Sequence, residues 1–210
     1  MFKPAGIIVV LLVLSFTSIS VASAEPANEL TIRVHDYAHL PTALVALTEQ
    51  RVREIYSSIG VSTRWIPSVD PTESAGKPIP RQAGELVLII LSPSMVRRKA
   101  LPDEVLGTAA VAPESGASVA YILFDHVSRV AGASTLQIVN VLAPVIAHEL
   151  GHLLLQIGSH SRGGLMRAFW SVRAFMGHNP QETAFTPAQG DDIRRAIRRR
   201  NGDEPNGGSD

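Results

Sequence analysis

Two histidines and a glutamate in the second half of the chain have the spacing of a metal site. The segment His148-Glu149-Leu150-Gly151-His152 has the pattern H-E-x-x-H. Residues four apart on a helix project from the same side, one turn apart, so both imidazoles can bind a single Zn²⁺ ion. Glu149 lies beside them and can accept a proton from water that the metal activates. This pattern predicts zinc-dependent hydrolysis of an amide bond.

The same residues have a purely structural alternative. Two histidines can be satisfied within a protein core, with Glu149 as their ion-pair partner. The surrounding sequence, VIAHELGHLLL, is strongly apolar. Buried charged and imidazole side chains in such a helix need a compensating interaction, and a bound metal provides one. The context therefore favours the metal site.

A catalytic zinc site needs a third protein ligand. His160 is the strongest candidate, because it follows the expected end of the helix and Gly158 can reverse the chain there. A histidine exposed at the surface is the alternative for this position. No spacing argument supports the remaining candidates, which are His35, His39, His126, His178 and Glu182. We expect His35 on an exposed strand face, His39 in a loop, and His126 at a helix cap or in solvent.

The elements that must position these residues follow from apolar periodicity. Alternating or continuous apolar runs predict strands at 30–37, 61–66, 85–91, 107–112 and 118–124. Helical spacing predicts helices over 41–59, 134–157 and 186–200, with a helical turn at 125–130. Pro144 lies inside the long helix and predicts a kink or a restart. Because strands come early and the large helices late, we expect one α+β domain with helices packed on a mixed sheet.

The N-terminal residues have the pattern of a secretory signal peptide. Lys3 precedes an apolar run over 6–19, and Ala22-Ser23-Ala24 offers a cleavage site. The run is shorter than the roughly 20 residues that a membrane-spanning helix needs. We therefore expect cleavage after Ala24, a secreted or periplasmic protein and no stable membrane insertion. This leaves residues 25–201 as the folded domain and 202–210 as a disordered tail.

Composition excludes several functions. The 210 residues include no Cys, which rules out disulfides, thiolate ligands and thiol nucleophiles. Nineteen basic residues balance nineteen acidic ones, so charge gives no case for a nucleic-acid partner. The arginines over 194–200 suit the C-terminal end of a helix dipole better than an anionic partner. A monomer is the default expectation.

The segment HELGHLLLQIGSHSRGGLM resembles the zinc helix, third ligand and Met-turn of the metzincin metallopeptidases. It is most similar to exported bacterial metzincin-like proteins with a HELGHLLLGSxSHSxxGIMRAxW-type segment. TIRVHDYAHLP to STRWI and FTPAQGDDIRR extend the similarity more weakly. The resemblance implies a single zincin-like or metzincin-like domain, in which a mixed twisted sheet, a long zinc helix, a Met-turn and a C-terminal helix surround one catalytic Zn²⁺. It also implies that His148, His152 and His160 are the ligands, Glu149 the general base and Met166 the methionine beneath the metal.

The chain departs from the usual metzincin pattern H-E-x-x-H-x-x-G-x-x-H. Leu155 stands where that pattern has glycine, and His160 lies two residues later than the usual third histidine. Three further helical residues add about 4.5 Å before the turn. A sharper reversal at Gly158 and Ser159 must then bring His160 back to the metal.

Two functional hypotheses follow from the resemblance. The first is an exported zinc endopeptidase acting on a peptide or protein substrate, with a cell-wall peptide as another possible amide. The second is a non-catalytic zinc-binding module with a structural or interaction role, and Glu149 favours catalysis over it. In metzincins the strand corresponding to 118–124 is an exposed edge that binds extended peptide, while an internal strand without a ligand role is the alternative.

Overall fold

The structure is a computed structural model that describes residues 28–67, 84–99, 101–111, 118–155, 160–175 and 180–202. The expected signal peptide and the residues after Gly202 lie outside this part of the chain. The strands are β1 (Glu29–Asp36), β2 (Ser62–Pro67), β3 (Leu86–Leu91), β4 (Gly107–Val111) and β5 (Ser118–Leu123). The helices are α1 (Thr42–Ser57), α2 (Pro93–Lys99), α3 (Phe124–Ala131), α4 (Thr135–Leu155), α5 (Val172–Phe175), the 3₁₀ helix η1 (Pro180–Thr183) and α6 (Pro187–Asn201).

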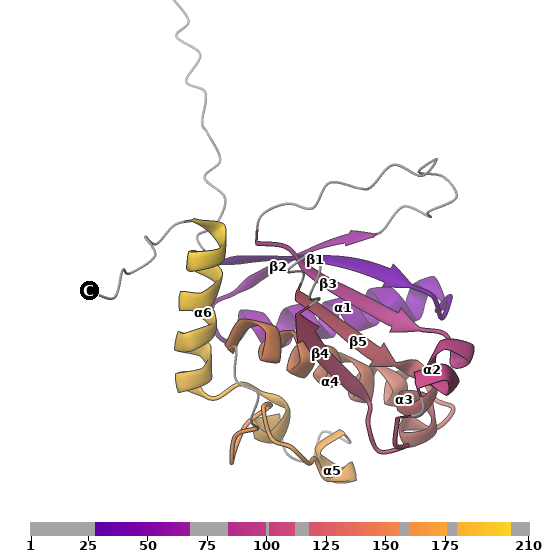
Figure 1. Cartoon of the computed structure of the whole chain (residues 1–210). Coiled ribbons are helices and arrows are strands. Elements are labelled where there is room, and N and C mark those ends of the chain that lie inside the picture. The colour runs from indigo at the N-terminus through magenta and orange to yellow at the C-terminus, as the bar shows by residue number, and fades with distance from the viewer. Residues whose placement is uncertain are drawn as a thin grey trace, which may run out of the picture.

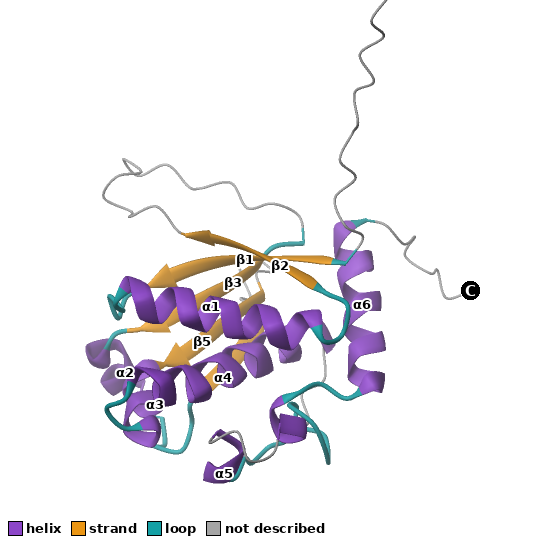
Figure 2. Ribbon diagram, turned by 180° about the vertical axis from the view of Figure 1, so that it is seen from behind, coloured by secondary structure: helices purple, strands orange, loops and turns teal. Residues whose placement is uncertain are grey.

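The five strands form one mixed sheet in the order β2-β1-β3-β5-β4. The first four run parallel, and only β4 is antiparallel to its neighbour β5. Ile32 on β1 sits opposite Trp65 on β2 and Leu86 on β3, which fixes the register of the parallel strands. Helices α1 and α4 lie side by side against one face of the sheet, and α6 stands at one end of it (Figures 1 and 2). The expected α+β fold with a mixed sheet is confirmed.

The core lies between the sheet and α4. Ile32, Leu88 and Ile122 project from the strands and are fully buried, as are Leu142 and Leu150 on α4. Helix α4 runs unbroken through Pro144, so the expected restart of the helix is wrong. Among the described residues, only α4 is apolar and long enough to span a membrane, and 78% of its most apolar stretch is buried inside the fold. Its composition is therefore that of a core helix.

Strand β5 is not the exposed edge that the metzincin resemblance implied, and it has the internal position that was the alternative. Ser118–Leu123 lies between β3 and β4, so it is an internal strand and not an exposed edge. Its side chains are buried on both faces of the sheet, which is why the sequence is apolar almost throughout. The antiparallel edge of the described sheet is β4, whose sequence GTAAV is short and weakly apolar.

A buried ion pair links β1 to the start of β3. Arg33 Nε donates to Glu85 Oε1, and Arg33 Nη2 donates to Glu85 Oε2 at 2.9 Å. The Glu85 side chain is fully buried and that of Arg33 is 10% exposed. This bidentate geometry satisfies both charges where neither reaches bulk water.

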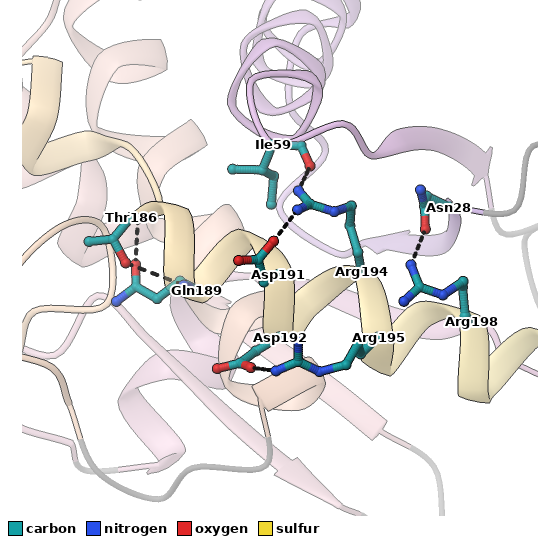
Figure 3. A network of polar contacts seen from close by, with 9 residues as sticks. All are labelled: Asn28, Ile59, Thr186, Gln189, Asp191, Asp192, Arg194, Arg195 and Arg198. Carbon is teal, nitrogen blue, oxygen red and sulfur yellow. Dashed lines mark hydrogen bonds and ion pairs between the residues drawn. The ribbon is translucent and has the colours of Figure 1, made fainter. Parts of the chain in front are cut away.

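Helix α6 is attached to its neighbours through the arginines of its own sequence. Arg194 donates to the Ile59 carbonyl just after α1 and pairs with Asp191 (Figure 3). Arg200 donates to the Leu153 carbonyl in α4 at 3.2 Å. The basic run therefore does more than meet the helix dipole, because it holds α6 against α1 and α4.

Candidate metal centre

Helix α4 and the segment after it bring three imidazoles together. One ring nitrogen from each of His148, His152 and His160 lies within 4.8 Å of the others. The ring centroids are 4.5 Å apart for His148 and His152, and 5.3 and 5.0 Å from these two to His160. His148 is buried, His152 half-buried and His160 exposed, so the cluster opens to solvent on the side of the third histidine. Residues 156–159, including the expected reversal at Gly158, lie outside the described residues.

A backbone carbonyl sets the orientation of His148. Its Nδ1 lies 2.8 Å from the Leu165 carbonyl oxygen. A carbonyl can only accept, so Nδ1 carries the proton and Nε2 of the neutral ring keeps its lone pair. That Nε2 faces His152 Nε2 at 2.9 Å. Burial lowers the pKa of His148 to about 4, against the Leu165 hydrogen bond, which raises it. The imidazole is therefore neutral at physiological pH and available as a metal ligand.

Glu149 is buried beneath the edge strand. The residue is 7% exposed. A Cβ atom placed on Gly107 would lie only 2.6 Å from Glu149 Cγ. Only glycine at the first position of β4 leaves room for this carboxylate. Within the described part of the chain, the carboxylate has no hydrogen-bond or ion-pair partner. Burial raises its pKa to about 8.

These residues fit a zinc ion. Imidazole nitrogens are preferred zinc ligands, and nitrogens on tetrahedral zinc lie about 3.3 Å apart. Here the two helical Nε2 atoms are 2.9 Å apart, and all three nitrogens lie within 4.8 Å of one another. A dication beside the unpaired Glu149 carboxylate would also offset the cost of burying that group. Three protein ligands leave a fourth position for water or substrate, as catalytic zinc sites do.

Met166 packs against α4 at Gly151, between the two helical histidines in sequence. It is 3% exposed, and its Sδ lies 2.6 Å from the position that a Cβ on Gly151 would occupy. Gly151 stands between His148 and His152 in the sequence, so the methionine contacts α4 at the level of the metal ligands. The Met-turn role of Met166 stays a prediction from the resemblance.

Trp170 adds an aromatic wall that sequence reasoning missed. Its ring lies edge-on to His148, with centroids 4.9 Å apart, and edge-on to Phe175 at 5.4 Å. The indole Nε1 is buried and has no hydrogen-bond partner among the described residues. The Leu165 carbonyl and Gly107 were missed as well. Backbone acceptors have no residue signature, and a glycine at a strand start resembles an ordinary turn residue.

His126 corrects an expectation. It is 4% exposed, neither a solvent-facing residue nor a helix cap, and its Nδ1 lies 2.8 Å from the Val105 carbonyl. Helix α3 begins directly after β5 and packs against the segment before β4, which covers this ring. The imidazole therefore attaches that segment to α3.

Three more candidates for the third ligand are not part of the histidine cluster. His35 is half-buried on β1, and His39 is exposed in the turn that follows. Glu182 faces Arg167 at 3.6 Å. His178 lies outside the described residues.

Comparisons with known proteins show the fold. No family model matches the sequence, and no curated protein matches it. The structure is similar to archaemetzincin from Methanopyrus kandleri, with a TM-score of 0.52 and 13% identity over 81% of this chain and 96% of that one. A zinc-dependent peptidase from Methanocorpusculum labreanum matches with a TM-score of 0.48 and 14% identity over 77% and 99%. The chain thus has a metzincin-like α+β fold, with a five-stranded mixed sheet and a long helix carrying His148 and His152.

Proposed function

We propose that this chain is an exported zinc metallopeptidase that hydrolyses internal peptide bonds of a peptide or protein substrate. The observation that carries the proposal is the convergence of three imidazoles on a metzincin-like fold, next in sequence to a buried carboxylate that has no partner among the described residues. His148, His152 and His160 are the proposed ligands of one Zn²⁺ ion. Glu149 is the proposed catalytic base.

The residues divide the chemistry between them. His148, His152 and His160 would hold a zinc ion, which would supply Lewis acidity toward the substrate carbonyl and toward water. Glu149 accepts a proton from the attacking water and then donates it to the leaving amine. The Leu165 carbonyl keeps His148 in the tautomer that presents Nε2. Burial beneath β4 restricts the access of bulk water to the Glu149 side chain, which is 7% exposed.

Strand β4 is the proposed substrate-binding element, in place of 118–124, for which an edge role and an internal role were both open. It is one of the two edges of the described sheet, and its first residue, Gly107, lies directly against Glu149. An extended peptide that pairs with this edge would place its backbone beside the proton acceptor. The monomeric state, the absence of nucleic-acid binding and the secreted or periplasmic location remain proposals from the sequence.

Zinc content and peptide cleavage, measured on the mature chain and on Glu149→Gln, test the proposal. We expect about one zinc per chain in both proteins and cleavage only by the wild type. Zinc with no cleavage by either protein would favour the non-catalytic module. Sequencing the N-terminus of the exported protein tests the location, because cleavage after Ala24 leaves Glu25 as the first residue.

A further inference from the structure

The segment that carries the third histidine rests on the N-terminus of α6. Ser161, directly after His160, donates its N–H to the Met166 carbonyl at 2.7 Å, which closes a tight loop. Leu165 donates its N–H to the Ala184 carbonyl at 2.7 Å, just before the helix begins. The third imidazole and the carbonyl that orients His148 therefore belong to one loop, and that loop is bonded to the start of α6.

One side chain joins this loop to the cap of the helix. Gln189 Oε1 accepts from the Thr186 N–H at 2.9 Å, and the Gln189 N–H donates to Thr186 Oγ1 at 3.3 Å, which together form a capping box (Figure 3). The same amide also reaches the loop. Its Nε2 donates to Ser161 Oγ at 3.0 Å and to the Gly163 carbonyl at 3.4 Å. The side-chain oxygen of Gln189 thus bonds to the helix cap, while its side-chain nitrogen bonds to the loop.

The loop and the cap are also in close steric contact. Gly164 has a left-handed backbone, with φ at 67°, and a Cβ there would lie 2.8 Å from Thr186 Cγ2 and 3.0 Å from Gln189 Oε1. A side chain at this position would force the loop away from the helix. The hydrogen bonds from Gln189 can form only because the two backbones approach this closely.

We infer that Gln189 is a positioning residue of the metal site, holding the loop of residues 161–165 so that His160 and the Leu165 carbonyl stay in place. The inference rests on the metal site of the proposed function, and it does not depend on catalysis. The need for such a residue follows from the geometry of the ligands. His148 and His152 are held by α4, whereas His160 is exposed and lies outside it. Ordering a loop costs backbone entropy, which the two bonds from Gln189 offset before a metal binds.

The variant Gln189→Glu separates the two roles of this side chain. Glutamate serves equally well in a capping box but has no N–H group, so the helix cap is kept and both N–H bonds to the loop are lost. The Ser161 hydroxyl could donate to the new carboxylate only by giving up its own bond to the Gly163 carbonyl, which would still loosen the loop. We expect zinc affinity, measured by chelator competition on the mature chain, to fall by about 10–100-fold. We also expect a changed visible absorption spectrum of the Co²⁺-substituted protein, because the ligand geometry changes. The urea midpoint of the metal-free protein should stay close to that of the wild type.

Two further variants make the test specific. Ser161→Ala removes one acceptor from the loop side and should weaken zinc binding in the same direction, and combining it with Gln189→Glu should add less than the sum of the two effects. Arg194→Met loosens α6 at its contact with Ile59, away from the loop. It should lower stability and leave the zinc affinity and the Co²⁺ spectrum unchanged.

Three results would overturn the inference. The first is a Gln189→Glu protein with wild-type zinc affinity and Co²⁺ spectrum. The second is an equal loss of affinity in Arg194→Met, because general loosening of α6 would then explain both. The third is a wild type that binds no zinc, which would also overturn the proposed function. A wild type that binds zinc but cleaves no peptide would refute only the peptidase, and a weakened Gln189→Glu would still support the inference.

Discussion

The close contact between Gly151 and Met166 predicts that Gly151→Ala lowers the free energy of unfolding. A second substitution, at Met166, should remove or reverse that loss. A Cβ on Gly151 would lie 2.6 Å from Met166 Sδ, 3.2 Å from Phe185 Cε1 and 3.3 Å from Met166 Cε. Non-bonded heavy atoms prefer about 3.5–4.0 Å, so Gly151→Ala creates an overlap of about 1 Å with the sulfur. The Met166 side chain must therefore move to make room for the new methyl group.

The magnitude follows from two opposing effects. Overpacking a buried site costs about 1–3 kcal/mol. Replacing glycine by alanine inside a helix returns about 1 kcal/mol. Because three atoms crowd the new methyl group, the upper part of the overpacking range applies, and we expect a net loss of about 1–2 kcal/mol in the free energy of unfolding.

Urea unfolding of four proteins measures this effect: the wild type, Gly151→Ala, Met166→Ala and the double variant. In the Met166→Ala background the sulfur is gone, so Gly151→Ala should become neutral or stabilising. The expected coupling between the two positions is about 2 kcal/mol. Gly163→Ala is the matched control, since a Cβ there meets no atom within 4 Å, and it should change stability by less than about 0.5 kcal/mol. Additive effects of the two substitutions would refute the reasoning.

Three other measurements test the site and the fold. Gly107→Ala should displace the Glu149 carboxylate and lower kcat/KM by about 100-fold with zinc content unchanged, and wild-type kinetics would contradict the close packing seen here. Glu85→Ala should cost about 3–5 kcal/mol in urea unfolding, because it leaves the Arg33 charge buried and unpaired, whereas a loss below 1 kcal/mol would show that the pair is not buried in solution. In the metal-free protein, the raised pKa of Glu149 contributes stability below pH 4.5 that is lost as pH rises to about 8. Glu149→Gln should therefore become more stable than the wild type by about 1.4 kcal/mol per pH unit across that interval, and a constant difference between the two proteins would contradict the burial of this carboxylate.

The sequence predicted the elements that carry strong apolar periodicity. The apolar run over 85–91 forms the buried strand β3, and the helix predicted around the H-E-x-x-H pattern is α4. These predictions succeed because burial on a sheet or against a helix demands apolar residues at regular intervals. Helix α2 was missed, since its seven residues span fewer than two complete turns and show no clear period.

Pairing between strands could not be predicted in the same way. The neighbours of β5 depend on contacts between residues far apart in the sequence, and its own apolar pattern fits either an edge or a central position. The prediction for His126 was wrong for the same reason. The segment that covers its ring precedes β4 and is distant from His126 in the sequence. The capping box of α6, in contrast, is visible in Thr186-Pro187-Ala188-Gln189, where a threonine is followed three residues later by a glutamine. What the sequence could not show is that the same glutamine also holds the loop of the third histidine.

X-ray absorption at the zinc edge counts the imidazoles that bind the metal. On the zinc-loaded mature chain, we expect three imidazole nitrogens at about 2.0–2.1 Å and one further oxygen ligand. The variant His160→Ala should lose one imidazole from this shell. A wild-type spectrum with only two imidazoles, or one that His160→Ala leaves unchanged, would contradict the three-histidine site.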